Sequence, residues 1–327
     1  DLENPRARMS DPVLFEMREK NEVIAYRTLL PDIFFDRNGD ARRFAWLSGN
    51  WVRPDKRRQG NSTRLLEMAE DLWKGCLMYT NYAPKSKAVY DSTGRYERIA
   101  LREGSRFYLR SSFDELLNKR VGSTRLFGIA DRLVNQLREN RIQAYEITSE
   151  RHCGVSEIDG FLSQLSELVK RLQQDALFRR DREIFKWALE FPWVTDQACG
   201  PLHYHFSYQA NRFENILLQF SDATGKIMGV MWIILHNSLL SVPYFFAGNE
   251  AVEACMADQI VQTMIEKDCT YTSIRNQSLL KHMQVHRKLF LGIRNMPQQI
   301  FAHRNLMELM PQDPVIHDGD GDVMFTG

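Results

Sequence analysis

The stretch that decides the fold is Trp51–Leu66, with the sequence WVRPDKRRQGNSTRLL. Strand-forming residues precede Pro54, and apolar residues recur at helical spacing after the turn, beginning with Leu65 and Leu66. The pattern predicts a strand that runs through a basic turn into an amphipathic helix starting near Asn61.

The same turn has the composition of an anion site. Gly60 lets the backbone come close to a ligand, and the amides of Gln59–Thr63 have no intrahelical partner at the positive end of the helix dipole. Four cationic side chains surround this end, namely Arg53, Lys56, Arg57 and Arg58. We therefore expect a phosphate group here, and a solvated basic turn is the alternative.

The residues of the turn resemble a known signature. Val52, Pro54, Arg57, Gly60 and Ser62 follow the order of the acyl-coenzyme A motif of the GNAT acetyltransferase superfamily, hydrophobic-x-Pro-x-x-Arg-x-x-Gly-x-Gly/Ala, with Ser62 in place of the second small residue. The resemblance implies acetyl-coenzyme A (acetyl-CoA) as co-substrate. The binding residues it implies are Trp51, Val52, Arg57, Arg58, Gln59, Gly60, Asn61, Ser62, Thr63, Asn81 and Lys85.

A second segment strengthens the resemblance. After an apolar strand expected at Cys76–Thr80, Asn81, Ala88, Tyr90 and Gly94 resemble the family's Asn…Ala-x-x-x-Tyr-x-x-x-Gly-Phe segment, although Asn81 lies farther from the tyrosine than usual. By resemblance, Tyr90 protonates the departing thiolate as general acid. A purely packing role for Tyr90 is the alternative, and Asn81 either orients pantetheine or caps a helix.

The resemblance also implies a geometry. The strand that ends near Val52 and the strand at Cys76–Thr80 are expected to splay apart, so that the pantetheine arm pairs between them. The sequence does not assign the base that takes the proton of the amine. The possibilities are Glu16, Glu22, Asp32, Tyr79 and a chain of water molecules.

The order of the expected elements predicts an α/β (α+β) fold with two GNAT-like domains, each a mixed, largely antiparallel central sheet flanked by helices. The expected ranges are 1–112 for the acetyl-CoA-binding domain, 113–160 for a helical connector, 161–310 for a second GNAT-like domain and 311–327 for an acidic, disordered tail. The strand and two helices that normally open the family's fold have no room before residue 13. We expect them upstream of Asp1 or missing.

The second domain is expected to lack a cofactor. Its corresponding turn, AGNEAVEA at residues 247–254, has no arginine and carries Glu250 and Glu253 where a phosphate would lie. Like charges repel an anion. Its expected role is to form a wall of the substrate cleft.

Composition limits the partners. The 327 residues include 43 Lys and Arg against 42 Asp and Glu, so no global field favours nucleic acid or an anionic membrane. The longest apolar run is far shorter than the roughly 20 residues of a membrane-spanning helix. The five cysteines, with no Cys-x-x-Cys pair, suggest reduced thiols and a cytoplasmic location.

Two clusters raise the question of a metal. His203 and His205 share one face of an expected strand but have no third ligand at a convincing spacing. The acidic run at residues 318–322 begins like a calcium loop, yet Val323 occupies the position that requires glycine. We expect no bound metal.

The sequence therefore favours an acetyl-CoA-dependent N-acetyltransferase that modifies a primary amine of a small molecule or amino sugar. A non-catalytic acyl-CoA-binding, sensing or structural interaction protein is the alternative from another class. A Fem-type aminoacyltransferase is the second alternative. The acceptor and the oligomeric state stay open at this point.

Overall fold

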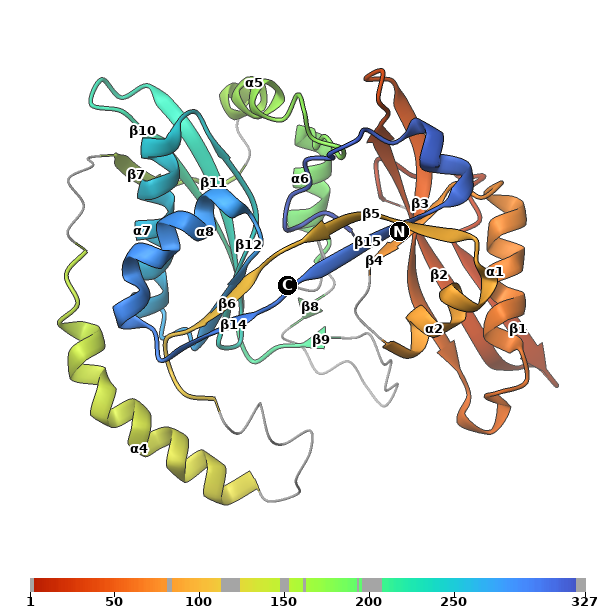
Figure 1. Ribbon diagram of the computed structural model, residues 1–327, viewed down its shortest axis with the longest axis horizontal. Coiled ribbons are helices and arrows are strands. Elements are labelled where there is room, and N and C mark those ends of the chain that lie inside the picture. The colour runs from red at the N-terminus through yellow and green to blue at the C-terminus, as the bar shows by residue number, and fades with distance from the viewer. Residues whose placement is uncertain are drawn as a thin grey trace. The chain divides into compact units, whose positions relative to one another are not determined.

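The structure, a computed structural model, describes residues 3–80, 84–112, 124–147, 153–160, 163–192, 194–195 and 208–321. The chain divides into two compact units, and each contains one mixed, mostly antiparallel sheet flanked by helices (Figure 1). Unit 1 comprises Asp1–Arg102, Gly160–Gln209 and Gln298–Thr326, and unit 2 comprises Glu103–Asp159 and Ala210–Pro297. The predicted fold class is confirmed.

Unit 1 is built on a six-stranded sheet. Its strands, in spatial order, are β1 (Leu14–Glu19), β2 (Glu22–Phe35), β3 (Ala41–Val52), β4 (Leu77–Thr80), β15 (Gln298–His303) and β5 (Tyr96–Arg102). The predicted hairpin between β1 and β2 turns at Lys20 and Asn21, both at positive φ. Only β3 and β4 pair in parallel.

Helices cover one face of this sheet. The short helix η1 (Pro54–Lys56) leads into α1 (Asn61–Leu72), whose Leu65, Leu66 and Ala69 are buried against β2 and β3. The next helix, α2 (Pro84–Thr93), contacts β5. An amphipathic helix after the basic turn was predicted from the periodicity of its apolar residues, and it is confirmed.

The other face carries aromatic side chains. Phe44 and Trp46 of β3 pack against Phe178, with ring centroids 5.6 and 5.1 Å apart. In the sequence, Phe178 lies in the loop that connects two further helices of unit 1. The remaining elements of this unit are α5 (Ser163–Leu172), α6 (Arg182–Glu190), the strands β8 (Val194–Thr195) and β9 (Tyr208–Gln209), and η3 (Arg304–Leu309).

Unit 2 is built on a seven-stranded sheet. Its strands, in spatial order, are β14 (Gly292–Asn295), β6 (Ser105–Tyr108), β13 (Tyr271–Ile274), β12 (Leu239–Ala247), β11 (Ile227–His236), β10 (Phe213–Ser221) and β7 (Gly154–Glu157). Its helices are α4 (Thr124–Gln143), α7 (Glu250–Glu266), α8 (Gln277–Met283) and η2 (Gln284–Leu289). The helix α7 packs on β11 and β12 and against α8.

Two neighbouring pairs of strands divide between the sheets. β5 belongs to the sheet of unit 1 and β6, which follows it directly, to that of unit 2; β14 and β15 divide in the same way. The compact units therefore do not coincide with the ranges expected from the sequence, 1–112, 113–160, 161–310 and 311–327. Residues 160–209 and the last strand belong with the first unit.

Two expectations are wrong. Residues 311–321 of the segment expected as a disordered acidic tail are ordered, because Asp320 is fully buried against Arg180. Reduced thiols were expected throughout, but Cys153 and Cys255 form a disulfide across 102 residues. Its ends lie ahead of β7 and inside α7, so it closes a loop within unit 2.

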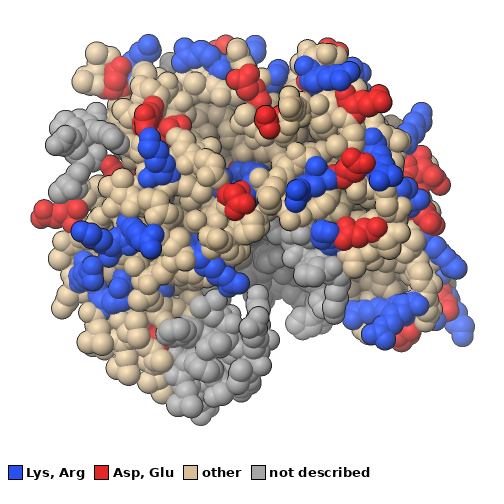
Figure 2. Space-filling view, in the orientation of Figure 1, with Lys and Arg blue, Asp and Glu red and all other residues tan. Residues whose placement is uncertain are grey.

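The surface and the helices show two general features. On the face drawn in Figure 2, basic and acidic side chains are interspersed rather than gathered by sign. Within the described part of the chain, no helix combines the length and the apolar character needed to cross a bilayer.

Candidate acyl-CoA site

The sheet of unit 1 opens between β3 and β4. The two strands pair only at Ala45 with Leu77 and at Trp46 with Met78. Beyond this point β3 continues to Val52 on its own on that side, while β4 turns its other edge to β15. The short pairing agrees with the splay implied by the family resemblance, and it leaves the rest of this edge of β3 without a described strand partner.

The helix that follows β3 begins without a cap. Gly60 is the residue before α1, with φ 78° and ψ 1°, and no side chain at this position accepts a bond from the first turn. Among the described residues, the amides of residues 58–63 have no hydrogen-bond partner. A Cβ on Gly60 would meet nothing within 4 Å, so the space beside Gly60 is open. The amides and the helix dipole together suit a phosphate.

The cations of the turn are not equally available. Arg53 is bound by Asp55 and Glu22, and Lys56 lies 2.6 Å from Glu19. The predicted ring of four cations is therefore partly neutralised by carboxylates.

The two remaining arginines differ from each other. Arg57 Nε donates to the carbonyl of Val52 at 3.0 Å, which ties the turn to the end of β3. Arg58 is exposed, with φ 61°. Arg57 and Arg58 are the cations left to meet an anion.

Polar contacts fix the rest of the turn. Asn61 Nδ2 donates to the carbonyl of Lys56 at 2.9 Å, and Gln59 Nε2 donates to the carbonyl of Asp55 at 3.1 Å. Asn50 of β3 bonds Ser62 in the first turn of the helix, 2.9 Å between Nδ2 and Oγ.

Three further predicted residues lie at the same place. Trp51 stacks on Tyr26 with ring centroids 5.5 Å apart, beside Val52 at the end of β3, and Thr63 lies in the first turn of α1. The structure thus brings nine of the predicted binding residues to one end of one strand and one helix. Asn81 and the side chain of Lys85 lie outside the described residues.

Tyr90 lies in α2 and is buried, with 4% of its surface exposed. Its ring packs on Tyr79 at 4.1 Å. Its hydroxyl oxygen accepts a hydrogen bond from Arg27 Nη1 at 3.0 Å. Arg27 lies opposite Asn50 in the β2–β3 pair, and Asn50 bonds Ser62. Arg27 and Asn50 therefore lie between Tyr90 and the turn at Ser62.

Arg27 is a residue that the sequence analysis missed. It is fully buried, and its Nε and Nη2 have no hydrogen-bond partner. A signal was present, because Arg27 alternates with Ala25 and Leu29 on the apolar face of β2. A charged residue in that register is costly to bury unless it is paired, so it marks a special environment.

The possible bases have other partners. Glu16 pairs with Arg18, and the Glu22 carboxylate is bound by Arg53. Asp32 is 5% exposed and is bound by Arg180 through both oxygens, at 2.7 and 2.9 Å. Burial raises the pKa of the fourth, Tyr79, which makes its hydroxyl a poor proton acceptor.

Unit 2 offers an internal comparison. Its helix α7 also follows the third strand of a meander, but Asn249 Oδ1 accepts from the amide of Val252 at 3.0 Å and caps the helix. Glu250 and Glu253 add negative charge to its first turn. The start of α7 therefore differs from that of α1: a side chain caps it and two glutamates lie in its first turn, whereas α1 follows the uncapped Gly60.

No metal site is evident in the described ranges, where no cluster of three or more His, Cys, Asp or Glu side chains is arranged around a common point. Asp318 and Asp320 of the calcium-loop-like run are bound by Arg102 and Arg180. His203 and His205 lie outside the described residues.

Comparison with known proteins supports the fold. No protein-family model and no curated protein sequence matches the chain. Among solved structures, N-myristoyltransferase from Saccharomyces cerevisiae with bound myristoyl-CoA superposes with a TM-score of 0.53 and 12% identity, over 94% of this chain and 70% of that one. A probable N-acyltransferase from Enterococcus faecalis gives 0.52 and 9% identity, over 91% and 64%.

A GCN5-related N-acetyltransferase from Anabaena variabilis also matches, with a TM-score of 0.48 and 10% identity. This chain covers 88% of its own length in that match but only 61% of the length of the Anabaena protein. The chain shares its fold with the N-myristoyltransferase and with the Enterococcus protein, and its two larger sheets agree with the fold class expected from the sequence.

Proposed function

We propose that the protein is an acyl-CoA-dependent N-acyltransferase, with acetyl-CoA as donor and a primary amine of a small molecule or amino sugar as acceptor. One observation carries the proposal: beside the gap between β3 and β4, α1 begins at an uncapped Gly60. The gap accommodates an extended arm, and the free amides accommodate a pyrophosphate. The fold neighbours named above as acyltransferases support the class.

The bound thioester would supply the activated acyl group for attack by the amine. In this proposal Tyr90 donates its proton to the departing sulfur. Arg27 already donates to the Tyr90 oxygen, so the hydroxyl proton is free to point elsewhere, and the guanidinium faces the oxygen when the proton has left. Arg57 and Arg58 would meet the phosphates.

The first experiment is calorimetric titration of acetyl-CoA into the wild type and into Gly60→Asp. We expect the substitution to weaken binding at least tenfold, because a carboxylate would lie in front of the amides that hold the pyrophosphate. Gly39→Asp is the matched control. Gly39 also has positive φ and open space, but it lies in the β2–β3 turn. Equal affinities in all three proteins would refute the site.

The length of the acyl chain is the next question, because one fold neighbour was solved with myristoyl-CoA. We expect acetyl-CoA to support release of free thiol in the presence of an amine panel. If myristoyl-CoA supports turnover and acetyl-CoA does not, the protein is still an acyltransferase, but its donor is a long-chain acyl-CoA.

A non-catalytic acyl-CoA-binding protein is a second candidate, and the burial of Tyr90 favours it. Tyr90→Phe separates the two. As an enzyme, the variant should bind acetyl-CoA normally and turn over more slowly, whereas absence of thiol release with every amine and both donors would favour the binding protein. We extend the proposal to the absence of nucleic-acid and membrane partners. The cytoplasmic location expected from reduced thiols loses that support, because Cys153 and Cys255 form a disulfide.

A further inference from the structure

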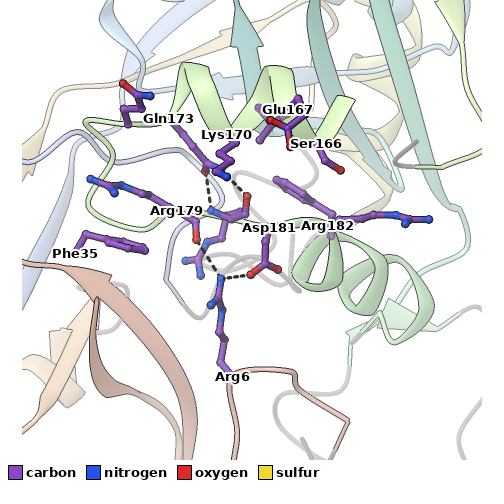
Figure 3. A pocket seen from close by; sticks show the side chains of 13 residues that line it. Arg6, Phe35, Ser166, Glu167, Lys170, Gln173, Arg179, Asp181 and Arg182 are labelled. Carbon is purple, nitrogen blue, oxygen red and sulfur yellow. Dashed lines mark hydrogen bonds and ion pairs between the residues drawn. The ribbon is translucent and has the colours of Figure 1, made fainter. Parts of the chain in front are cut away.

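A second cavity of unit 1 lies apart from the candidate acyl-CoA site. It has a volume of about 900 Å³ and is lined by α5, by the turn that follows it, by the start of α6 and by Phe35 at the end of β2 (Figure 3). Phe35 is nine residues from Tyr26, which stacks on Trp51 at the other site. At about 3.4 Å per residue, Tyr26 and Phe35 are roughly 30 Å apart along β2. The volume lies within the range typical of small-molecule sites.

The cavity combines apolar walls with positive charge. Val169 and Phe185 are buried in its wall, and Phe35 closes one side beneath the guanidinium of Arg179, 4.1 Å from its ring centroid. Such a surface accepts the apolar body of a ligand, while the charge is held at its edge.

Five cations line the cavity, namely Arg6, Lys170, Arg179, Arg180 and Arg182, and carboxylates neutralise two of them. Arg6 lies 2.8 Å from Asp181, and Arg180 is held between two buried aspartates on the sheet side. Their guanidinium groups serve as fixed walls rather than as ligands.

Two other cations have no carboxylate. Lys170 and Arg179 make no ion pair with any described residue, and Glu167 is the one lining carboxylate besides Asp181. Two residues of the lining also have a buried polar atom without a hydrogen bond, Nε of Arg179 and Oγ of Ser166. Buried groups of this kind are normally satisfied by protein, water or ligand.

We propose that this cavity binds a small organic anion, a carboxylate or a phosphate ester with an aromatic or aliphatic body. The anionic group would lie between Arg179 and Lys170. The body would lie against Phe35, Val169 and Phe185. This site is separate from the proposed acyl-CoA site and does not depend on it.

The probe is 8-anilino-1-naphthalenesulfonate, an anion with two aromatic groups whose fluorescence rises in apolar surroundings. Titration into the full chain should show saturable binding. Arg179→Met and Lys170→Met should each weaken it about tenfold, since each removes a charge-assisted contact but keeps an apolar stem. The matched control, Lys186→Met, removes an exposed cation of α6 that does not line the cavity, and it should bind like the wild type.

A third variant, Ser166→Phe, should weaken binding by occupying part of the cavity with a bulky side chain, without changing its charge. It also keeps the proposal testable if Arg179→Met does not fold. Equal binding by all the variants would overturn the site, as would no binding to the wild type at millimolar probe.

Displacement of the bound probe by small competitors identifies the chemical class of the ligand. Benzoate and phenyl phosphate should compete, and the better competitor identifies the anionic group as carboxylate or phosphate. Benzyl alcohol, which has a similar body and no charge, should compete at least tenfold more weakly. Competition by benzyl alcohol as strong as that by both anions would overturn the assignment of an anion site.

Discussion

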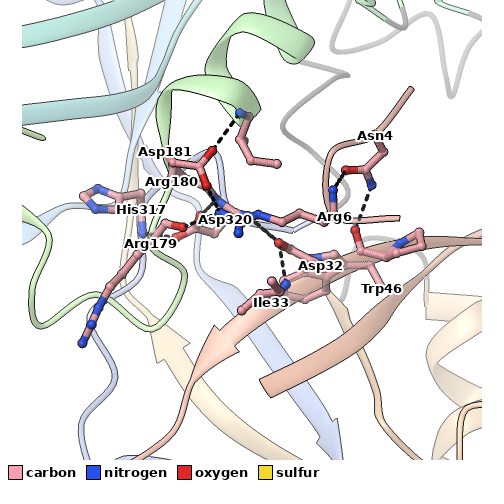
Figure 4. Close-up of polar contacts among 12 residues, drawn as sticks. Asn4, Arg6, Asp32, Ile33, Trp46, Arg179, Arg180, Asp181, His317 and Asp320 are labelled. Carbon is pink, nitrogen blue, oxygen red and sulfur yellow. Dashed lines mark hydrogen bonds and ion pairs between the residues drawn. The ribbon is translucent and has the colours of Figure 1, made fainter. Parts of the chain in front are cut away.

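Arg180, one of the buried arginines of unit 1, gives the sharpest test of what holds this unit together. Arg180 is 3% exposed and lies between Asp32 of β2 and Asp320 near the chain end, both of which are buried (Figure 4). Nη1 reaches both oxygens of Asp32, at 2.7 and 2.9 Å, and Nε and Nη2 reach Asp320 at 3.1 and 3.0 Å. One guanidinium thus neutralises two carboxylates from distant parts of the sequence.

Arg180→Met removes the cation and leaves both carboxylates buried. Breaking a buried pair from one side costs about 3–5 kcal/mol, because the remaining charge has lost its partner. With about 2–4 °C per kcal/mol for a unit of this size, the melting temperature should fall by roughly 6–20 °C. Thermal and urea unfolding followed by circular dichroism measure both quantities.

Two further variants test the reasoning. Arg171→Met removes an exposed arginine of α5 and should change stability by no more than about 0.5 kcal/mol. Adding Asp320→Asn to Arg180→Met should restore part of the loss, because one stranded charge is removed. If Arg180→Met is as stable as Arg171→Met, the ion-pair network does not stabilise the fold.

Three other predictions concern stability. Asn249→Ala removes the cap on the Val252 amide and should cost about 1 kcal/mol in urea unfolding. Burial lowers the pKa of His303 below its usual 6.5. The contribution of the neutral His303 side chain to stability is therefore complete above pH 6.5 and is lost as the pH falls through the lower pKa of the folded state. His303→Asn should accordingly lose less stability than the wild type on acidification between about pH 6.5 and 5. Cys255→Ser opens the loop closed with Cys153 and should cost about 2–5 kcal/mol, an effect that dithiothreitol should reproduce in the wild type only.

Local patterns predicted most of the secondary structure. The strands β10, β11 and β12 follow apolar runs bounded by turns, and α1 follows its apolar spacing. The strand β7 has little strand signal of its own, because Gly154–Glu157 is exposed and contains one apolar side chain, and it pairs with β10. Its formation depends on the partner strand β10 rather than on a pattern in its own residues.

The partition of strands between the sheets could not be predicted from local sequence. A short apolar strand such as β15 suits either sheet, and its choice depends on partners some 200 residues away. One residue did carry a signal. Gly104, between β5 and β6, has the carbonyl oxygen of Met296 only 2.7 Å from where a Cβ would lie, so the chain there requires glycine.

The binding residues of the candidate acyl-CoA site followed from sequence because they are contiguous along one turn. The partners of Arg180 and Arg27 were missed, because each is brought together from separate segments. Asp32 had been considered as a base, yet its ion pair needs an arginine 148 positions away. Contacts of this kind depend on the packing of the whole unit and produce no regular spacing of residues along the sequence.

Because the strands of the second half of the chain are divided between the two sheets, this half contributes to the candidate site in the first half. β15 lies between β4 and β5, and β5 is the edge of its sheet, with β15 as its strand partner. Phe301 of β15 stacks on Tyr79 at 4.9 Å, and Tyr79 in turn packs on Tyr90. A fragment that ends at residue 112 would therefore lack the strand that supports the proposed general acid. The second half of the chain thus contributes to the first by completing its sheet.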